Sequence, residues 1–224
     1  MRIAFSKLCV VRPARSFATR LMAGLALAGA FLAAPAPQAA AQPTAALPAM
    51  SLSATTTGPA RPIAAWAEFC ERYPGECAVD RTEPASITLT PALWQTINAV
   101  NRRINRAVEA VTDQEHWRAA DRWDLAEDGR GDCEDFQLLK RRLLVEAGLP
   151  RRAMRMTVVI DEKGEGHAVL TLITSRGDLI LDNKTNAVLP WTQTGYTFVK
   201  RESQEAVGWM ALGRDASPLT AANR

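Results

Sequence analysis

The sequence contains little cysteine, and its apolar runs are short. Four cysteines in 224 residues are too few for a small fold that is held together by disulfides. The uncharged apolar run at residues 21–34 is shorter than the roughly 20 residues that a membrane-spanning helix needs. Apolar residues nevertheless make up 47% of the chain, and charged residues 23%. A hydrophobic core is therefore feasible, and wholesale disorder is excluded.

Acidic residues are absent from the first 41 residues, which hold five of the 27 basic residues. The remainder of the chain has 22 basic and 24 acidic side chains, so its formal net charge is −2. Nucleic-acid binding is driven by the neutralisation of phosphates. The slightly acidic remainder therefore predicts that nucleic acid is not a partner.

The N-terminus has the pattern of a secretory signal. A basic leader precedes the apolar run at residues 21–34, and the small residues Ala39-Ala40-Ala41 offer a cleavage site. We expect residues 1–41 to be removed as a signal peptide, which leaves no transmembrane segment and predicts a periplasmic or secreted protein. The alternative is an uncleaved anchor helix. No cysteine follows the apolar run, which argues against a lipoprotein.

The rest of the chain divides by composition. Residues 42–62 are rich in Pro, Ala, Ser and Thr and lack periodic apolar spacing, which predicts a flexible linker. Residues 63–213 are long enough for one domain with a good core. Residues 214–224 are expected to form a disordered tail.

Spacing predicts helices first and strands afterwards. Apolar residues recur every three or four positions through residues 91–111, as a buried helical stripe requires, and Thr90 and Pro91 are suited to its first turn. The expected helices cover residues 66–73, 91–111 and 132–147, and the expected strands cover residues 154–160, 167–174, 179–181 and 196–200. This order predicts an α+β fold in which N-terminal helices pack on an antiparallel sheet.

Cys133 occupies the start of a predicted helix, in the run GRGDCEDF. The free amides and the dipole at a helix N-terminus stabilise a thiolate and can receive an oxyanion. His167 begins a predicted strand and Asp182 ends the next, so paired antiparallel strands would hold them side by side. The helix packed on this sheet would complete a catalytic triad, with a Cys133–His167 ion pair that keeps the thiol reactive near neutral pH. The alternative is three unrelated residues of a core, a strand and a turn.

Three carboxylates, those of Asp132, Glu134 and Asp135, flank this cysteine. They would repel a thiolate unless a cation or an arginine neutralised them, and their hard oxygen atoms suit calcium. No EF-hand loop is present in the sequence. The alternative needs no metal, because acidic residues interact favourably with the dipole at a helix N-terminus.

Cys70 and Cys77 lie on either side of Pro74-Gly75 in the run FCERYPGEC. A turn at this point could bring them within disulfide reach in an oxidising compartment. Two free, buried thiols are the alternative. A zinc site is disfavoured, because no histidine or further cysteine is close in the sequence.

Basic residues cluster locally in the third predicted helix, in the segment after it and at the start of the next predicted strand. We expect a solvated face, and docking to an acidic partner is the alternative. The residues are Lys140, Arg141, Arg142, Arg151, Arg152 and Arg155.

Taken together, the runs GRGDCEDFQLLKRRLL, GEGHAVL and GDLILDN resemble those of the bacterial transglutaminase-like cysteine peptidases, which belong to the papain and transglutaminase fold group. The resemblance extends over about residues 64–210 and includes FCERYPGEC, VNRRINRA and PWTQTGYTF. It implies that Cys133, His167 and Asp182 are the catalytic residues. It also implies that calcium is bound by the acids on either side of the cysteine, Asp132 and Glu134.

The resemblance further implies a biological role. Relatives of this type are periplasmic, calcium-dependent proteases that cleave large surface adhesins and so release cells from biofilms. Some are held inactive by an inner-membrane receptor for cyclic di-GMP. We therefore expect an exported thiol protease, a hydrolase with a protein substrate. The alternatives are a transglutaminase-type acyl transferase, because the same triad serves both reactions, and a non-catalytic binding module on the same fold.

Overall fold

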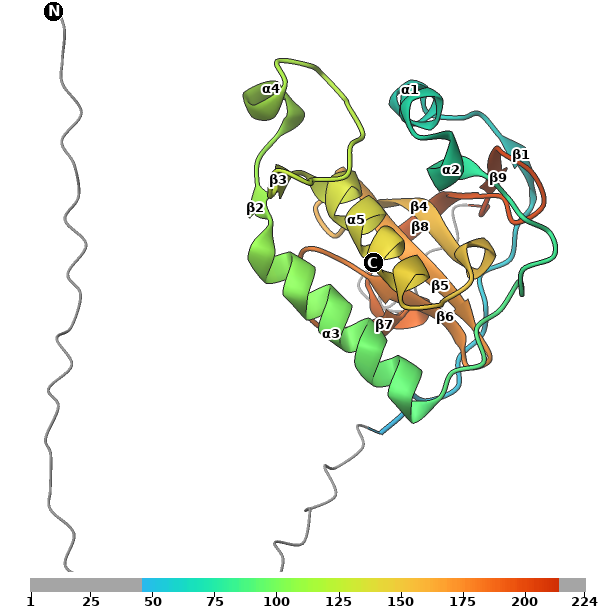
Figure 1. Ribbon diagram of the computed structural model, residues 1–224. Coiled ribbons are helices and arrows are strands. Elements are labelled where there is room, and N and C mark those ends of the chain that lie inside the picture. The colour runs from blue at the N-terminus through green and yellow to red at the C-terminus, as the bar shows by residue number, and fades with distance from the viewer. Residues whose placement is uncertain (1–45, 214–224) are drawn as a thin grey trace, which may run out of the picture. The chain divides into compact units, whose positions relative to one another are not determined.

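Residues 46–213 are described by a computed structural model of the chain, shown in Figure 1. The predicted signal peptide, residues 1–41, and the predicted tail, residues 214–224, lie outside the described residues. Within residues 46–213, no helix has both the length and the apolarity that crossing a membrane requires.

An antiparallel sheet forms the centre of the domain. The strands in chain order are β1 (Gly58–Ala60), β2 (Glu109–Ala110), β3 (Arg130–Gly131), β4 (Met154–Ile160), β5 (Gly166–Thr174), β6 (Gly177–Leu181), β7 (Leu189–Pro190), β8 (Thr197–Glu202) and β9 (Trp209–Ala211). Within the described residues the sheet has seven strands in the order β1-β9-β8-β4-β5-β6-β7, and all neighbouring pairs are antiparallel. A separate, parallel pair joins β2 to β3.

The helices are α1 (Ala64–Arg72), α2 (Pro74–Cys77), α3 (Pro91–Ala107), α4 (Asp113–His116) and α5 (Cys133–Glu146), with 3-10 turns at Arg151–Ala153 and Trp191–Gln193. α5 and α3 lie over one face of this sheet, whereas α4 lies in the loop beside β3. Figure 1 shows α5 crossing over β4 and β5, with α3 beside it. The arrangement confirms the predicted α+β fold of helices on an antiparallel sheet.

The core lies on both faces of the sheet and fixes α5 in place. Leu138 and Leu144 of α5 are fully buried. In β5 the side chains alternate, so Leu170 and Leu172 pack in the same cluster as these helix residues, while Val169 packs in a second cluster with other residues. Each buried leucine contributes about 1.5–3 kcal/mol. The helix that begins at Cys133 is therefore held to the sheet by apolar packing.

The apolar periodicity predicts a helix that ends at residue 111, but α3 ends at Ala107. Val108 is buried and has an extended backbone. The next two residues pair with β3, which directly precedes α5. The last residues of the periodic segment therefore leave the helix and enter a strand pair that leads toward the start of α5.

The prediction of a solvated basic face is wrong for three of its residues. Lys140 and Arg141 are fully buried on α5, and Arg155 is 2% exposed on β4. Arg141 finds a buried acidic partner, and Arg155 donates to the carbonyl groups of residues 151, 154 and 203. Each of the three side chains has hydrogen-bond acceptors inside the domain, although Arg141 Nε itself has none. These bonds offset part of the cost of burial.

Residues 46–62, which composition assigned to a flexible linker, are packed on the domain. The backbone N–H of Ala54 donates to Asp178 at 3.1 Å, Trp191 donates to the carbonyl of Leu52 at 2.7 Å, and β1 pairs with β9. Gly177 has a φ of +95°, and a Cβ there would lie 2.4 Å from the carbonyl oxygen of Ser51. This part of the predicted linker is thus part of the folded domain.

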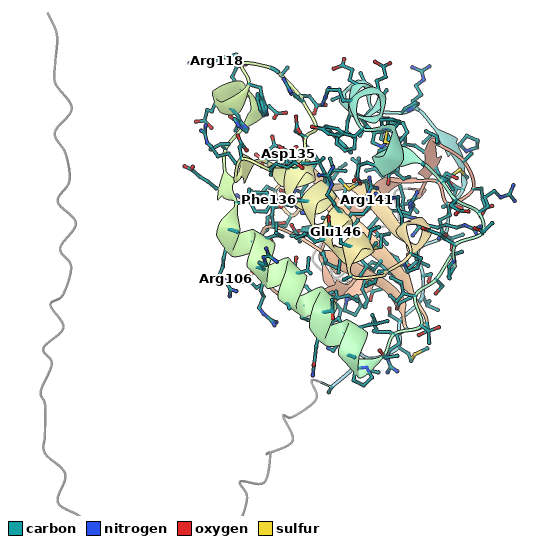
Figure 2. The ribbon with its side chains drawn as sticks, viewed as in Figure 1. Arg106, Arg118, Asp135, Phe136, Arg141 and Glu146 are labelled. Carbon is teal, nitrogen blue, oxygen red and sulfur yellow. A yellow bond between two sulfur atoms is a disulfide. The ribbon has the colours of Figure 1, made fainter. Side chains whose placement is uncertain are left out.

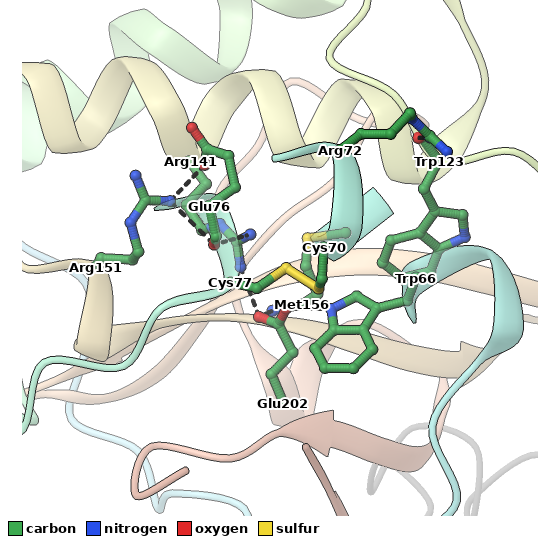
Figure 3. Close-up of a disulfide and its surroundings, with 10 residues drawn as sticks. All are labelled: Trp66, Cys70, Arg72, Glu76, Cys77, Trp123, Arg141, Arg151, Met156 and Glu202. Atoms are coloured by element: carbon green, nitrogen blue, oxygen red, sulfur yellow. Dashed lines mark hydrogen bonds and ion pairs between the residues drawn. A yellow bond between two sulfur atoms is a disulfide. The ribbon is translucent and has the colours of Figure 1, made fainter. Parts of the chain in front are cut away.

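The buried carboxylate of Glu202 connects the helices to the sheet (Figure 3). One oxygen accepts from Arg141 Nη1 of α5 at 2.6 Å and from the backbone N–H of Met156 in β4 at 3.0 Å. The other accepts from the indole N–H of Trp66 in α1 at 2.7 Å. Three elements therefore share one acceptor group at the end of β8.

We predict that Glu202→Gln lowers the free energy of unfolding by about 3 kcal/mol, because it leaves the buried Arg141 charge without its partner. Urea denaturation measures this loss. The matched control is Glu205→Gln, whose carboxylate pairs with Arg81 and Arg152 at an exposed site. It should change stability by less than about 1 kcal/mol. Equal effects of the two variants would contradict the role assigned to Glu202.

A second prediction concerns Lys140, whose ammonium donates to Gln137 Oε1 at 3.2 Å. Burial lowers the pKa of Lys140 to about 7, although the charge of Asp182 opposes this. An unfolded lysine has a pKa of about 10.4, so between about pH 7 and 10 the unfolded chain binds more protons than the folded chain. Stability attributable to this residue therefore rises with pH, by up to about 1.4 kcal/mol per pH unit.

Lys140→Met should remove this dependence. The free energy of unfolding of the wild type, minus that of the variant, is expected to increase across that pH window in a series of urea titrations. Lys163→Met, at an exposed turn, serves as the control and should give a constant difference. A constant difference for Lys140→Met would show that the buried amine does not titrate in this range.

Candidate functional site

Cys133 is the first residue of α5 and is partly exposed. The chain reaches it through β3 and an extended Asp132, so the thiol lies at the N-terminal end of the helix, where Asp132 and Asp135 form a capping box. The backbone N–H of Ala168 in β5 is near enough to the sulfur atom to act on the thiol, and it lowers the pKa of Cys133 against the larger effect of burial. This contact brings the thiol beside the residue that follows His167.

His167 and Asp182 are brought together as predicted by their places at the ends of strands. His167 Nε2 lies 2.9 Å from Asp182 Oδ1, and both residues are buried. A carboxylate only accepts hydrogen bonds, so Nε2 carries the proton and Nδ1 is left as the basic nitrogen. Burial opposes ionisation of Asp182, but the hydrogen bonds of His167 and Tyr196 hold its pKa below the ordinary value.

The thiol itself has a different partner from the one expected. Cys133 Sγ donates to Glu134 Oε2 at 3.1 Å. Burial, followed by the negative charge of Glu134, raises the pKa of Cys133 well above its ordinary value. The predicted thiolate–imidazole pair with His167 is therefore not the resting arrangement in this structure.

Carboxylates from two segments surround the start of α5. Asp132, Glu134 and Asp135 belong to the helix start, and Asp113 and Asp121 belong to the loop that contains α4. Oxygen atoms of Asp113, Asp121 and Glu134 lie within 4.8 Å of one another, and so do those of Asp113, Asp132 and Asp135. Figure 2 shows Asp135 at the beginning of α5. All three predicted metal ligands are thus in one cluster.

The electrostatics of this cluster favour a bound cation. Burial and the charges of Asp132 and Asp113 raise the pKa of Asp135 to about 8. Burial and Asp132 raise the pKa of Glu134 well above its ordinary value. Asp113 Oδ1 and Asp132 Oδ1 are buried, and neither has a hydrogen-bond donor. Unpaired buried oxygen atoms in a wholly carboxylate cluster fit a hard cation such as calcium, which takes six to eight oxygen ligands.

Backbone contacts hold the cluster together. Asp135 accepts from the backbone N–H of Asp124 at 2.6 Å and from that of Asp132 at 3.3 Å. Gly131 makes room for this side chain, because a Cβ there would lie 2.6 Å from Asp135 Oδ2. Asp135 therefore joins the loop to the helix that carries Cys133.

Asp113 and Asp121 were not among the residues predicted from the sequence. Both lie in the polar segment between α3 and α5, where no periodicity indicates which side chains turn inward. Thr112 before Asp113 was an available signal, since Thr112 caps α4 and so fixes the position of Asp113 in its first turn. Tyr196, which contacts Asp182, was also missed and had been expected only as the start of a strand.

Cys70 and Cys77 form a disulfide with a Cα–Cα distance of 5.5 Å (Figure 3). It links α1 to α2, on the side of the domain that supports the α4 loop. Arg72 donates to the carbonyl of Trp123 at 2.6 Å, and the hydroxyl of Tyr73 donates to Asp124 at 3.2 Å. The disulfide-bonded helices therefore contact the loop that supplies part of the carboxylate cluster.

Comparison with known proteins identifies related sequences and structures. A family model described as "Bacterial transglutaminase-like cysteine proteinase" matches residues 55–217. A structure of Legionella pneumophila LapG is similar, with 26% identity and a TM-score of 0.47 over 58% of this chain and 76% of that one. The calcium-bound LapG structure has 27% identity and a TM-score of 0.47, over 57% of this chain and 74% of that one. The EGTA-treated LapG structure has 27% identity and a TM-score of 0.46, over 53% of this chain and 67% of that one. A search of curated proteins finds no match.

Proposed function

The chain belongs to the bacterial transglutaminase-like cysteine proteinase family, and we propose that Cys133, His167 and Asp182 carry out its hydrolysis of peptide bonds. The observation that carries this proposal is the 2.9 Å bond from His167 Nε2 to Asp182. Ala168, the residue after His167, also acts on the Cys133 thiol through its backbone N–H. These contacts support a nucleophile, a base and an orienting acid within one site.

Each group has a defined task in the reaction. His167 Nδ1 takes the proton of the Cys133 thiol, and the sulfur attacks the carbonyl carbon of the scissile peptide bond. Free amides at the start of α5 hold the oxyanion that forms. The imidazolium, stabilised by Asp182, then gives its proton to the leaving amine as the C–N bond breaks. A water molecule, deprotonated by the same imidazole, releases the acyl group from sulfur and restores the thiol.

Calcium is the cation that the carboxylate cluster fits. The residues that would hold it are Asp113, Asp121, Asp132, Glu134 and Asp135. When bound, it supplies positive charge that offsets the carboxylates beside the thiol, and so opposes their effect on the pKa of Cys133. Because Asp113 and Asp121 belong to the α4 loop and the other ligands to the start of α5, a bound cation would hold these two segments together.

The substrate that the family resemblance implies is a large surface adhesin. An acyl transferase with the same triad is the rival reaction, in which an amine rather than water accepts the acyl group. Peptide hydrolysis is the better supported of the two, because the family that matches residues 55–217 is one of proteinases.

We predict that the chain from residue 42 to residue 224 cleaves members of an internally quenched peptide library in the presence of calcium. Cys133→Ser and His167→Ala should each reduce kcat by at least about 10³-fold, and Asp182→Asn by up to about 10⁴-fold. Glu205→Gln makes the same carboxylate-to-amide change at an exposed position and should retain the wild-type rate. The released fragments are measured by fluorescence and mass spectrometry.

Inclusion of a labelled amine in the same assay distinguishes the rivals. Incorporation of the label in place of cleavage would identify an acyl transferase. Full cleavage by Cys133→Ser would exclude this cysteine as the nucleophile. Adhesin fragments are the substrates to test once a cleaved peptide is known.

Calcium should bind with a measurable gain in stability. At a concentration of about 100 times Kd, a ligand specific for the folded state adds about 2.7 kcal/mol, which appears as a rise in Tm. We predict that Asp135→Asn and Asp113→Asn weaken calcium binding at least about tenfold in titration calorimetry, while Glu205→Gln binds as the wild type does. Equal Tm values with calcium and with a chelator would contradict the calcium site.

A further inference from the structure

Tyr196 is the residue that completes the hydrogen bonding of the Asp182 carboxylate. Its hydroxyl donates to Asp182 Oδ2 at 2.6 Å. The other oxygen, Oδ1, accepts from His167 Nε2 at 2.9 Å and from the backbone N–H of Lys184 at 3.0 Å. Both oxygen atoms therefore accept hydrogen bonds, Oδ1 from two donors and Oδ2 from one.

The backbone of Asp182 is fixed independently. Asn105 of α3 donates to its carbonyl at 2.9 Å, and donates at the same distance to the carbonyl of Thr185 in the following turn. The remaining freedom of this residue is rotation of its side chain, which would carry Oδ1 away from the imidazole. The bond from Tyr196 opposes that rotation.

Tyr196 also contacts the imidazole directly. Its ring and that of His167 form a T-shaped pair, with centroids 5.8 Å apart and planes at 80°. Tyr196 is 5% exposed. Burial, with the hydrogen bond to Asp182, raises the pKa of Tyr196 far above its ordinary value, so the phenol keeps its proton and remains a donor.

We propose that Tyr196 is a positioning residue for peptide hydrolysis, whose hydroxyl holds the Asp182 carboxylate in the orientation that directs the proton of His167 to Nε2 and leaves Nδ1 as the base. The inference deepens the proposed function and rests on it. Tyr196 itself touches neither the thiol nor the scissile bond in this scheme. It acts through Asp182 and His167.

The test is Tyr196→Phe, which keeps the ring and its packing against His167 and removes only the hydroxyl. Loss of a hydrogen bond to a charged group should lower kcat about tenfold or more on the quenched peptide that the wild type cleaves, with KM unchanged. The matched control is Thr157→Val. It removes a buried hydroxyl that bonds to Thr171 at 2.7 Å, in the same sheet but away from the triad.

A spectroscopic readout separates this inference from the proposed function. The described residues contain two histidines, each with Nε2 bonded to an aspartate: His167 to Asp182, and His116 to Asp128 at 2.7 Å. In ¹⁵N-histidine NMR spectra, Tyr196→Phe should shift the Nε2 proton resonance of His167 and leave that of His116 in place. Thr157→Val should shift neither resonance. This measurement needs no substrate.

The outcomes are distinguishable. If the wild type cleaves no peptide, the proposed function fails, and the NMR spectra still decide whether Tyr196 orients the pair. An unchanged His167 resonance, or a kcat equal to that of Thr157→Val, overturns the inference. If Tyr196→Phe does not fold, incorporation of 3-fluorotyrosine changes the donor strength of the phenol while keeping its ring. The His167 resonance should then move relative to that of His116, and an unmoved resonance again overturns the inference.

Discussion

The buried Glu202 carboxylate is the interaction on which the arrangement of helices and sheet depends. It accepts from Arg141 in α5, Trp66 in α1 and the backbone of Met156 in β4. Apolar packing holds α5 on the sheet, and the hydrogen bonds of Glu202 add a directional contact. A displacement that separated Arg141 from Glu202 would leave a buried charge without its partner, at a cost of about 3–5 kcal/mol. The start of α5, and with it Cys133, is thereby fixed relative to β5.

The site consists of two halves that meet at this helix start. On one side, β5 and the end of β6 supply His167 and Asp182 already paired. On the other side, the α4 loop and α5 itself supply carboxylates whose negative charges repel one another. Cys133 lies between the halves, with contacts to Ala168 on the first and to Glu134 on the second. The charge of the acidic half therefore acts on the Cys133 thiol through the adjacent Glu134 side chain.

The sequence predicted those helices and strands whose own residues carry a recognisable local pattern. Apolar spacing gave α3 and α5, and apolar segments separated by turns gave β4 to β6. The ends of these elements gave the positions of Cys133, His167 and Asp182. Residues whose role depends on a contact with a residue far away in the sequence were not predicted. Tyr196 meets Asp182 across a turn and a 3-10 helix, Asp113 meets Asp135 across 22 positions, and Arg141 is buried only because Glu202 is there to receive it. The short strand β1 has no apolar alternation, and its partner β9 comes near the end of the domain.

That last pairing has a consequence for how the chain reaches this fold. Gly58 of β1 lies opposite Ala211 of β9, so the first and the last strands within residues 46–213 are hydrogen-bonded neighbours. Contacts between distant positions are slow to form, because the intervening chain must be closed into a loop first. β9 is the final strand to emerge during synthesis, and until then β8 has an open edge and β1 has no place to bind. The sheet can be completed only after the whole domain has been made, which leaves a period in which this edge is exposed to other chains.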